Sequence, residues 1–235
     1  MASIDVHSGA AIPPVHDMAA KPGELAVGVV IGRTSEFFEF FVYAIASVLV
    51  FPRLIFPFVS PLTGTLYSFA IFALGFVVRP AGTIAFLRLE RLYGRGIKLS
   101  VVLLLMGSST VALGFLPAYR QAGSIAVAAL IVLRSVQGFA LGGSWDGLAS
   151  LLAMNAPEKR RGWYAMLPQL GAPLGLIVAS SLFAFFVLAL STEDFLSWGW
   201  RYPFFVAFAI NVVALFARLR IVVAPEYEHL FKLGE

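Results

Sequence analysis

The chain has 235 residues, of which 60% are hydrophobic and only 13% are charged. Soluble domains carry about 25% charged residues, so a water-soluble core of this length could not hold so much apolar surface. The composition excludes a soluble globular protein and predicts an integral membrane protein.

Six apolar runs follow a short N-terminal tail, which we predict over residues 1–23. Each run is near the ~20 residues that a membrane-spanning helix needs. We therefore predict an all-α transmembrane bundle over 24–223 and a C-terminal tail over 224–235. The runs lie at 25–50, 63–87, 97–117, 124–153, 163–190 and 203–223.

Lys and Arg are concentrated in alternate loops, which predicts the orientation. The first, third and fifth loops hold only Arg53, Arg120 and Arg201. The second loop, the fourth loop and the C-terminal tail hold Arg88, Arg91, Arg95, Lys98, Lys159, Arg160, Arg161, Arg218, Arg220 and Lys232. We therefore expect both termini in the cytoplasm, and we read the net charge of +4 as loop topology and not as nucleic-acid binding.

The first apolar run contains three charged residues that are expensive at membrane depth. Arg33, Glu36 and Glu39 fall at i, i+3 and i+6, so they form one slowly rotating stripe of a helix. At 1.5 Å per residue, the two Glu lie roughly 17–21 Å from the inner end of that helix. Ionisable residues within a membrane helix are candidates for function.

Arg134 in the fourth run lies roughly 15 Å below the outer end, and so near the depth of the two Glu. One interpretation is a buried carboxylate that gains and loses a proton beside Arg134. The other is a static ion network that joins helices. Gln137, Gln169 and Asn211 are the remaining polar groups at depth, and each could contact a substrate or a neighbouring helix.

Other features favour helix packing and disfavour soluble enzyme chemistry. Gly138, Gly142 and Gly143, and the pair Gly171 and Gly175, are typical of closely packed membrane helices. The chain has no Cys, its three His lie in the tails, and it has no phosphate-binding Gly-rich loop followed by Lys and Ser or Thr. We therefore expect no enzyme activity, no cofactor and no metal site.

Several motifs resemble the major facilitator superfamily. Arg134-Ser135-Val136-Gln137-Gly138 is similar to its fourth-helix Arg-x-x-Gln-Gly motif, and Arg79-Pro80-Ala81-Gly82 with Gly94-Arg95 resembles its loop signature. The metabolite:proton symporter branch is indicated by Glu36-Phe37-Phe38-Glu39-Phe40, which resembles Glu-Trp-Tyr-Asp-Phe, and by Gly142-Gly143-Ser144-Trp145, which resembles Gly-Gly-Glu-Trp. Further matching segments are 157–162, 169–171, 198–204 and 224–227.

The resemblance implies a fold and a set of site residues. The fold is one six-helix half of a transporter, made of two inverted three-helix repeats, in the bacterial inner membrane. Glu36, Glu39 and Arg134 are implied for proton or substrate coupling, and Arg33, Gln137, Gln169 and Trp145 are substrate-facing candidates. The loop and gating motif comprises Arg79, Gly82, Glu90, Arg91, Gly94 and Arg95.

The chain departs from the family pattern at three places. One extra residue separates Glu90 from Gly94, and Ser144 stands where the family has Glu. The chain also stops where the central cytoplasmic loop of the family would begin, so we expect only one wall of the substrate cavity.

These departures leave three interpretations open. A second copy or a separate second half could complete a symporter of small organic acids or zwitterions. Alternatively, the chain could be an accessory or assembly subunit of a larger membrane complex, such as a respiratory one, or a piece of a longer product.

Overall fold

A computed structural model describes residues 22–144, 152 and 156–223, with side chains for 26–94, 96–144, 152 and 156–213. The described residues contain helices and turns but no strand. The predicted tails at 1–23 and 224–235 lie outside them, except that Pro22 and Gly23 form the start of the first helix.

Six of the described helices have 19 or more residues. They are α1 (Pro22–Leu49), α3 (Pro61–Tyr93), α4 (Arg95–Gly114), α6 (Ser124–Gly143), α9 (Gly171–Ala189) and α11 (Tyr202–Val223). Short segments lie between them: α2 (Phe51–Leu54), α5 (Tyr119–Ala122), η2 (Glu158–Arg160), α8 (Arg161–Met166), η3 (Leu167–Leu170), α10 (Thr192–Ser197) and η4 (Gly199–Arg201).

Five of the predicted apolar runs each fall on one of these helices, with some differences at the ends, whereas the run predicted over 163–190 is divided among α8, η3 and α9. The run predicted over 63–87 forms a longer helix, α3, because Arg and Glu do not stop a helix, and it ends at Gly94. Gly94 has a φ of +84°, which suits glycine, and it alone separates α3 from α4. The run predicted over 124–153 is described as helix only to Gly143.

Four of the described helical segments are long and apolar enough to cross a membrane: 61–93, 96–114, 124–143 and 158–189. Every 18-residue window of α1 contains at least three charged residues, drawn from Glu24, Arg33, Glu36 and Glu39. The side chains of α11 are described only to Val213. The charges in α1 therefore set it apart from the other long helices.

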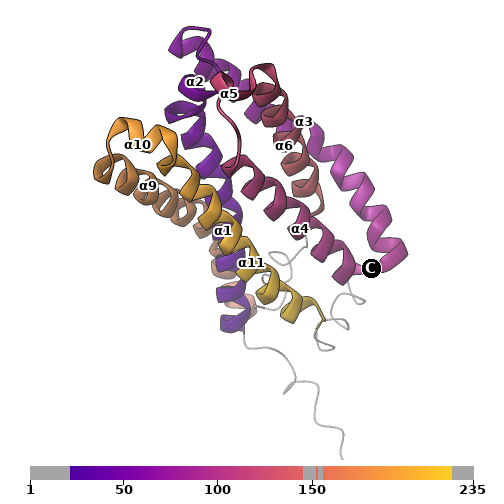
Figure 1. Ribbon diagram of the computed structural model, residues 1–235. Coiled ribbons are helices and arrows are strands. Elements are labelled where there is room, and N and C mark those ends of the chain that lie inside the picture. Colours follow the sequence, from indigo (N-terminus) through magenta and orange to yellow (C-terminus); the bar gives the residue numbers. More distant parts are fainter. Residues whose placement is uncertain (1–21, 145–151, 153–155, 224–235) are drawn as a thin grey trace, which may run out of the picture.

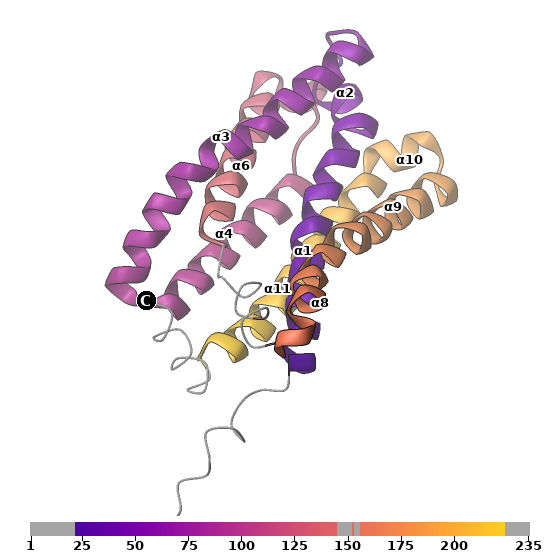
Figure 2. The ribbon, with the colours of Figure 1, turned by 180° about the vertical axis from the view of Figure 1, so that it is seen from behind.

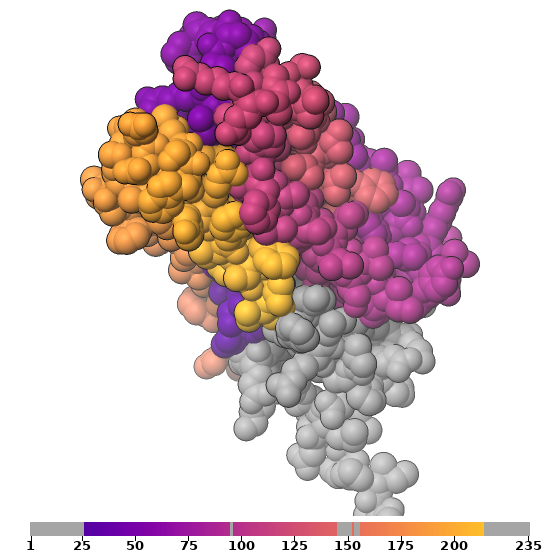
Figure 3. All heavy atoms as spheres, in the orientation of Figure 1, coloured from indigo at the N-terminus to yellow at the C-terminus, as the bar shows by residue number. Residues whose placement is uncertain are grey.

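The helices form a bundle with α1 along its middle (Figures 1 and 2). α9 packs on one side of α1, and α3 with α6 lies on the other. α4 packs against both α6 and α11, and α11 also contacts α1. On the face seen in Figure 3, atoms of α4 and of the described part of α11 lie against each other. This arrangement encloses the part of α1 that carries Glu39.

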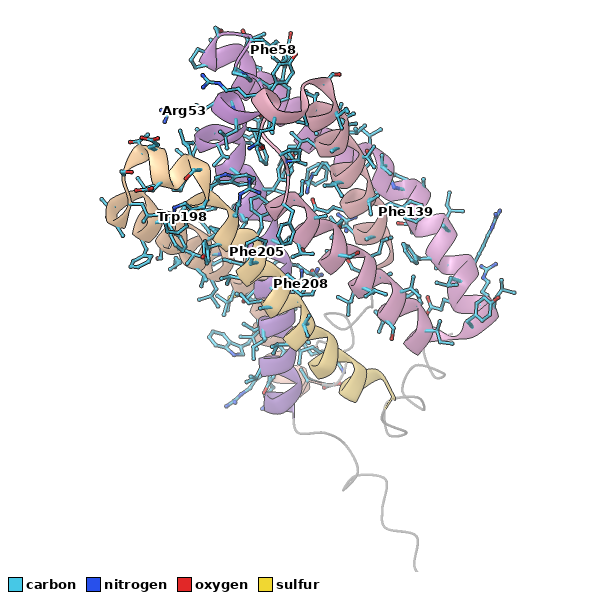
Figure 4. The ribbon with its side chains drawn as sticks, viewed as in Figure 1. Arg53, Phe58, Phe139, Trp198, Phe205 and Phe208 are labelled. Atoms are coloured by element: carbon cyan, nitrogen blue, oxygen red, sulfur yellow. The ribbon has the colours of Figure 1, made fainter. Side chains whose placement is uncertain are left out.

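Aromatic side chains fill the contact between α4 and α11. Phe205 and Phe208, labelled in Figure 4, lie on α11 and face Gly114 and Gly107 of α4, where a Cβ atom would come within 2.6 Å and 3.2 Å of the respective rings. The ring of Phe115 packs against that of Phe205 in a tilted arrangement, with 5.0 Å between ring centroids. Glycines on one helix therefore accommodate large rings on the other.

The crossing of α3 and α6 also depends on glycine. A Cβ atom added to Gly138 would lie 2.2 Å from the carbonyl oxygen of Gly75, and one added to Gly142 would lie 2.3 Å from that of Arg79. One added to Gly82 would lie 2.0 Å from the carbonyl oxygen of Phe139. The two backbones touch here, as small residues permit in membrane bundles.

Replacing Gly138 with Ala should therefore separate α3 from α6 and destabilise the bundle. Overpacking of a tight contact costs about 1–3 kcal/mol, which should lower the midpoint of thermal unfolding in detergent by several degrees. Gly162→Ala is the matched control, because nothing lies within 4 Å of a Cβ atom there. Equal midpoints for the two variants would contradict this account.

Candidate functional site

The carboxylate of Glu39 receives hydrogen bonds from three different helices. The Asn211 amide on α11 donates to Oε2 at 2.9 Å, and the Gln137 amide on α6 donates to Oε1 at 3.1 Å. The Thr110 hydroxyl on α4 also donates to Oε1. The Glu39 residue is only 6% exposed, so these donors replace water around the buried carboxylate.

Glu36 lies one turn before Glu39 and has a different environment. Its carboxylate pairs with the Arg33 guanidinium at 2.9 Å, and the side chains of the two residues are 13% and 29% exposed. An i,i+3 pair on one helix neutralises both charges locally. The predicted stripe therefore divides into a partly exposed ion pair and a buried single carboxylate.

Arg134 is buried on α6 and is held by two hydrogen bonds and two aromatic rings. Its Nη1 donates to Gln137 Oε1 at 3.1 Å, and its Nε donates to the carbonyl oxygen of Phe72 at 3.4 Å. The guanidinium carbon lies 4.4 Å from the ring centroids of both Tyr43 and Phe72. Cation–π attraction of this kind suits Arg because its charge is spread over a plane.

The absence of a side chain at Gly75 makes room for Arg134. A Cβ atom at that position would lie 2.9 Å from Arg134 Nε. Gly75 also forms the closest contact with Gly138, so the helix crossing and the position of the guanidinium depend on the same residue.

No ion pair within 4.0 Å joins Arg134 to Glu39 in the described structure. The Gln137 amide lies between them instead, accepting from Arg134 through its oxygen and donating to Glu39 through its nitrogen. The partnership expected from equal depth is therefore indirect. A neutral amide can satisfy a cation and an anion at once because it carries both a donor and an acceptor.

A small cavity of about 30 Å³ borders this network. Its volume suits a water molecule and not a metabolite. The cavity lies among α1, α3, α4 and α6 and is lined by Glu36, Glu39, Phe40, Gly75, Phe76, Met106, Arg134, Gln137, Gly138 and Leu141. The buried carboxylate and the guanidinium thus face the same partly open cavity.

The residues of the predicted loop motif lie in the C-terminal half of α3, at the turn after it and at the start of α4. The Lys98 ammonium is buried and donates to Glu90 at 2.7 Å. Arg79 borders a larger cavity of about 260 Å³, together with Lys98 and Thr83. Arg91 is exposed, Gly94 forms the turn, and the side chain of Arg95 lies outside the described residues.

The remaining substrate-facing candidates do not join the Glu39 network. Gln169 lies in η3 with an exposed side chain, and Trp145 is outside the described residues. Gly82 contributes to the crossing of α3 and α6.

Sequence analysis missed Thr110, although a signal was present. Thr110 ends the polar run Ser108-Ser109-Thr110 within an apolar helix. It lies roughly 22 Å from the start of α4, close to the depth of Glu39 in α1. Comparing depths would have grouped it with Glu39, but only the packing of α4 shows that it faces that residue.

The sequence matches the family model for sugar (and other) transporters over residues 26–227. The chain belongs to this family. The resemblance to the major facilitator superfamily is thereby confirmed. No solved structure matches the chain.

Several relatives in this family are transport proteins. The inner membrane metabolite transport protein YhjE of Escherichia coli (strain K12) is 41% identical over 89% of this chain and 48% of its own length. The shikimate transporter of the same organism is 36% identical over 86% and 46%. A protein of Staphylococcus haemolyticus (strain JCSC1435) named as a candidate proline/betaine transporter is 33% identical over 92% and 46%.

The chain spans about half the length of the curated relatives it matches. Their names confirm that this is a membrane transporter family and not an enzyme family. An integral membrane location follows from the apolar helices and from the family.

Replacing Arg134 with Lys should destabilise the bundle although the charge is kept. An ammonium cannot lie flat beside Tyr43 and Phe72 while also reaching Gln137 and the Phe72 carbonyl. The loss should be about 1–3 kcal/mol, measured as a lower thermal midpoint in detergent. Arg120→Lys on the exposed surface of α5 is the control and should have no effect. An unchanged midpoint for Arg134→Lys would be inconsistent with this packing.

Proposed function

We propose that the chain forms one half of a proton-coupled symporter for small organic acids or zwitterionic metabolites. A second copy or a separate second half completes it. The observation that carries the proposal is the buried Glu39 carboxylate, held by donors from three helices beside Arg134. The names of the relatives, which include shikimate and proline/betaine transporters, support the substrate class.

Glu39 is the group that exchanges the proton in this proposal. It is the carboxylate enclosed by the network, whereas the Glu36 charge is matched by Arg33 within the same helix. A buried carboxylate can take up a proton when its surroundings change, because burial and hydrogen bonding have opposite effects on its charge. Its position at the cavity links that proton to whatever occupies the space.

Arg134 supplies the positive charge that a carboxylate substrate needs. Its guanidinium borders the same cavity as Glu39 and forms no direct ion pair with the Glu39 carboxylate. The cavity of about 30 Å³ is too small for a metabolite, so the substrate binds when the second half forms the opposite wall. Arg33 and Glu36 lie nearest to that wall, with Gln169 and Trp145 as further candidates.

The residues of the loop motif act as the gate in this proposal. The Lys98–Glu90 ion pair, in which Lys98 is buried and Glu90 is partly exposed, ties the start of α4 to the end of α3. Losing Glu90 as a partner would leave the buried Lys98 charge uncompensated, so the pair favours one arrangement of the two helices over others. Arg79, Gly82, Arg91, Gly94 and Arg95 are assigned to the same gate.

The membrane arrangement in this proposal has six crossings, two inverted repeats and cytoplasmic termini. The packing supports the repeats: exchanging α1, α3 and α4 with α6, α9 and α11 turns the pair α1–α9 into α6–α3, and α4–α6 into α11–α1. The pair α4–α11 maps onto itself. All of these pairs are in contact, as a two-fold relation requires.

Transport is favoured over the accessory-subunit interpretation. The relatives named above are transport proteins, and the described residues retain a buried carboxylate and an Arg at one cavity.

The orientation predicts which positions react with a membrane-impermeant maleimide. The chain has no Cys, so single cysteines report one site each. In intact cells we expect labelling of Thr192→Cys in α10, and labelling of Leu92→Cys near the end of α3 only after lysis. Both positions are exposed, so labelling depends on whether the reagent can reach the side of the membrane on which each position lies. The reverse pattern would invert the proposed topology.

Glu39→Gln tests the transport proposal itself. The chain, alone or with the product of a neighbouring second-half gene, is reconstituted in liposomes and given a pH gradient with labelled shikimate or betaine. We expect accumulation driven by the gradient to fall to the background, because Gln cannot carry the proton. Substrate exchange at equal pH should continue, since Gln keeps the shape and a hydrogen-bonding oxygen.

Glu193→Gln is the control for the same chemical change, because Glu193 is exposed in α10. It should transport at the normal rate. Absence of gradient-driven uptake by every combination, or full uptake by Glu39→Gln, refutes the proposed function.

A further inference from the structure

The Thr110 hydroxyl lies within reach of two different acceptors. One is the Glu39 carboxylate, and the other is the backbone carbonyl oxygen of Met106 at 2.9 Å, one turn earlier in α4. A hydroxyl carries a single proton, so it donates to one of these oxygens at a time. The same hydroxyl oxygen accepts from the Gln137 amide at 2.8 Å.

The hydrogen bonds are complete when Glu39 is ionised. Oε1 accepts from Thr110 and Gln137, and Oε2 accepts from Asn211. The Thr110 hydroxyl donates to the carboxylate and accepts from Gln137. In this state the Met106 carbonyl needs no proton from Thr110, because it also accepts from the Ser109 hydroxyl at 2.8 Å.

Each polar atom of this network can also have a hydrogen-bond partner when Glu39 is protonated. A proton bound to Oε1 faces the Thr110 oxygen, which has a second lone pair to accept it. The Thr110 O–H then turns to the Met106 carbonyl. The new covalent O–H bond is on Glu39, and no covalent bond of Thr110 changes. The hydrogen bonds from Gln137 and Asn211 to Glu39 stay in place.

We propose that Thr110 is a positioning residue that reverses its hydrogen bond with Glu39 when that carboxyl gains or loses a proton. The reversal keeps every polar atom around Glu39 paired in both states, without a helix having to move. A bilayer offers no water to pair a polar group that loses its partner, so the reversal removes a barrier to proton exchange.

The other two donors cannot perform this role while they hold their present contacts. The Gln137 oxygen is occupied by Arg134, and only its nitrogen faces Glu39. Asn211 serves the other carboxylate oxygen, Oε2, through its nitrogen. Both amides donate and do not accept from Glu39, which leaves Thr110 as the group that can do either.

The charged groups near Glu39 come from α6 and from α1 itself. α6 presents Arg134, and α1 presents Glu36, which is paired with Arg33. α3 borders the cavity with Gly75 and Phe76, and α4 and α11 contribute the uncharged Thr110 and Asn211. The reversal therefore responds to the protonation of one carboxyl group in a fixed set of neighbours.

This inference rests on the proposed function only in taking Glu39 as the group that exchanges protons. Its test needs no transport and no second half. The purified chain in lipid is studied by infrared spectroscopy between acidic and alkaline pH. The carboxylic acid band that disappears in Glu39→Gln is assigned to Glu39.

Thr110→Cys provides a direct probe of the reversal. The chain contains no other thiol, so its S–H stretching band is unique. We expect this band to change frequency as the thiol alternates between Glu39 and the Met106 carbonyl, with the same pH midpoint as the Glu39 band. A constant S–H band while Glu39 titrates overturns the proposal.

Thr110→Val tests the accepting half of the reversal. Val has the shape of Thr without the hydroxyl, so protonated Glu39 loses its acceptor, and its C=O band should move to higher wavenumber. Thr110→Ser should restore the normal band. Ser68→Ala is the control, because Ser68 is a buried hydroxyl bonded only to the Gly64 carbonyl, at 2.8 Å. An unmoved band in Thr110→Val refutes the role of Thr110.

A variant that does not fold is recognised by aggregation on size exclusion, and Thr110→Cys and Thr110→Ser then carry the test. The outcome is separable from the transport assay. Coupled band changes without any uptake would uphold the reversal and refute the symport proposal. Gradient-driven uptake with a constant S–H band would uphold the symport proposal and refute the reversal.

Discussion

The need to keep one buried carboxylate hydrogen-bonded organises this bundle. Glu39 is removed from water, and an unsatisfied carboxylate there would cost far more than any single packing contact contributes. Donors from α4, α6 and α11 meet at it. Four helices that are distant in sequence are therefore held in one register by a single side chain, and a shift of any of them breaks a hydrogen bond in a medium that offers no replacement.

Close helix packing and site chemistry depend on the same residues. Gly75 lets α3 touch α6 at Gly138, and the space it leaves is filled by the Arg134 guanidinium. The tight crossing therefore fixes the distance between Arg134 and the rings of Tyr43 and Phe72. A movement of α3 against α6 would change the surroundings of the cation and of Gln137 together. This gives a physical route from helix motion to the charge state of the site.

The two carboxylates of the charged stripe lie in different surroundings. Glu36 and Arg33 keep part of their surface exposed, whereas Glu39 is enclosed within the bundle. The hydrogen bonds of the buried carboxylate are provided by the described residues alone, whereas the Arg33–Glu36 ion pair remains partly accessible from outside the bundle.

The sequence by itself determined the membrane class, the family and the approximate bounds of the long helices, because hydropathy, charge and short motifs are local properties. It also identified Glu39, Arg134 and Gln137, since polar groups in apolar runs are conspicuous. Only the tertiary structure decided that Gln137 separates Arg134 from Glu39, that Lys98 is buried, and that Thr110 and Asn211 complete the network. The physical reason is that these contacts join different helices, apart from the Arg134–Gln137 bond within α6. Spacing along one helix fixes depth and face, but the neighbour across a helix interface depends on how closely the glycines let the helices approach.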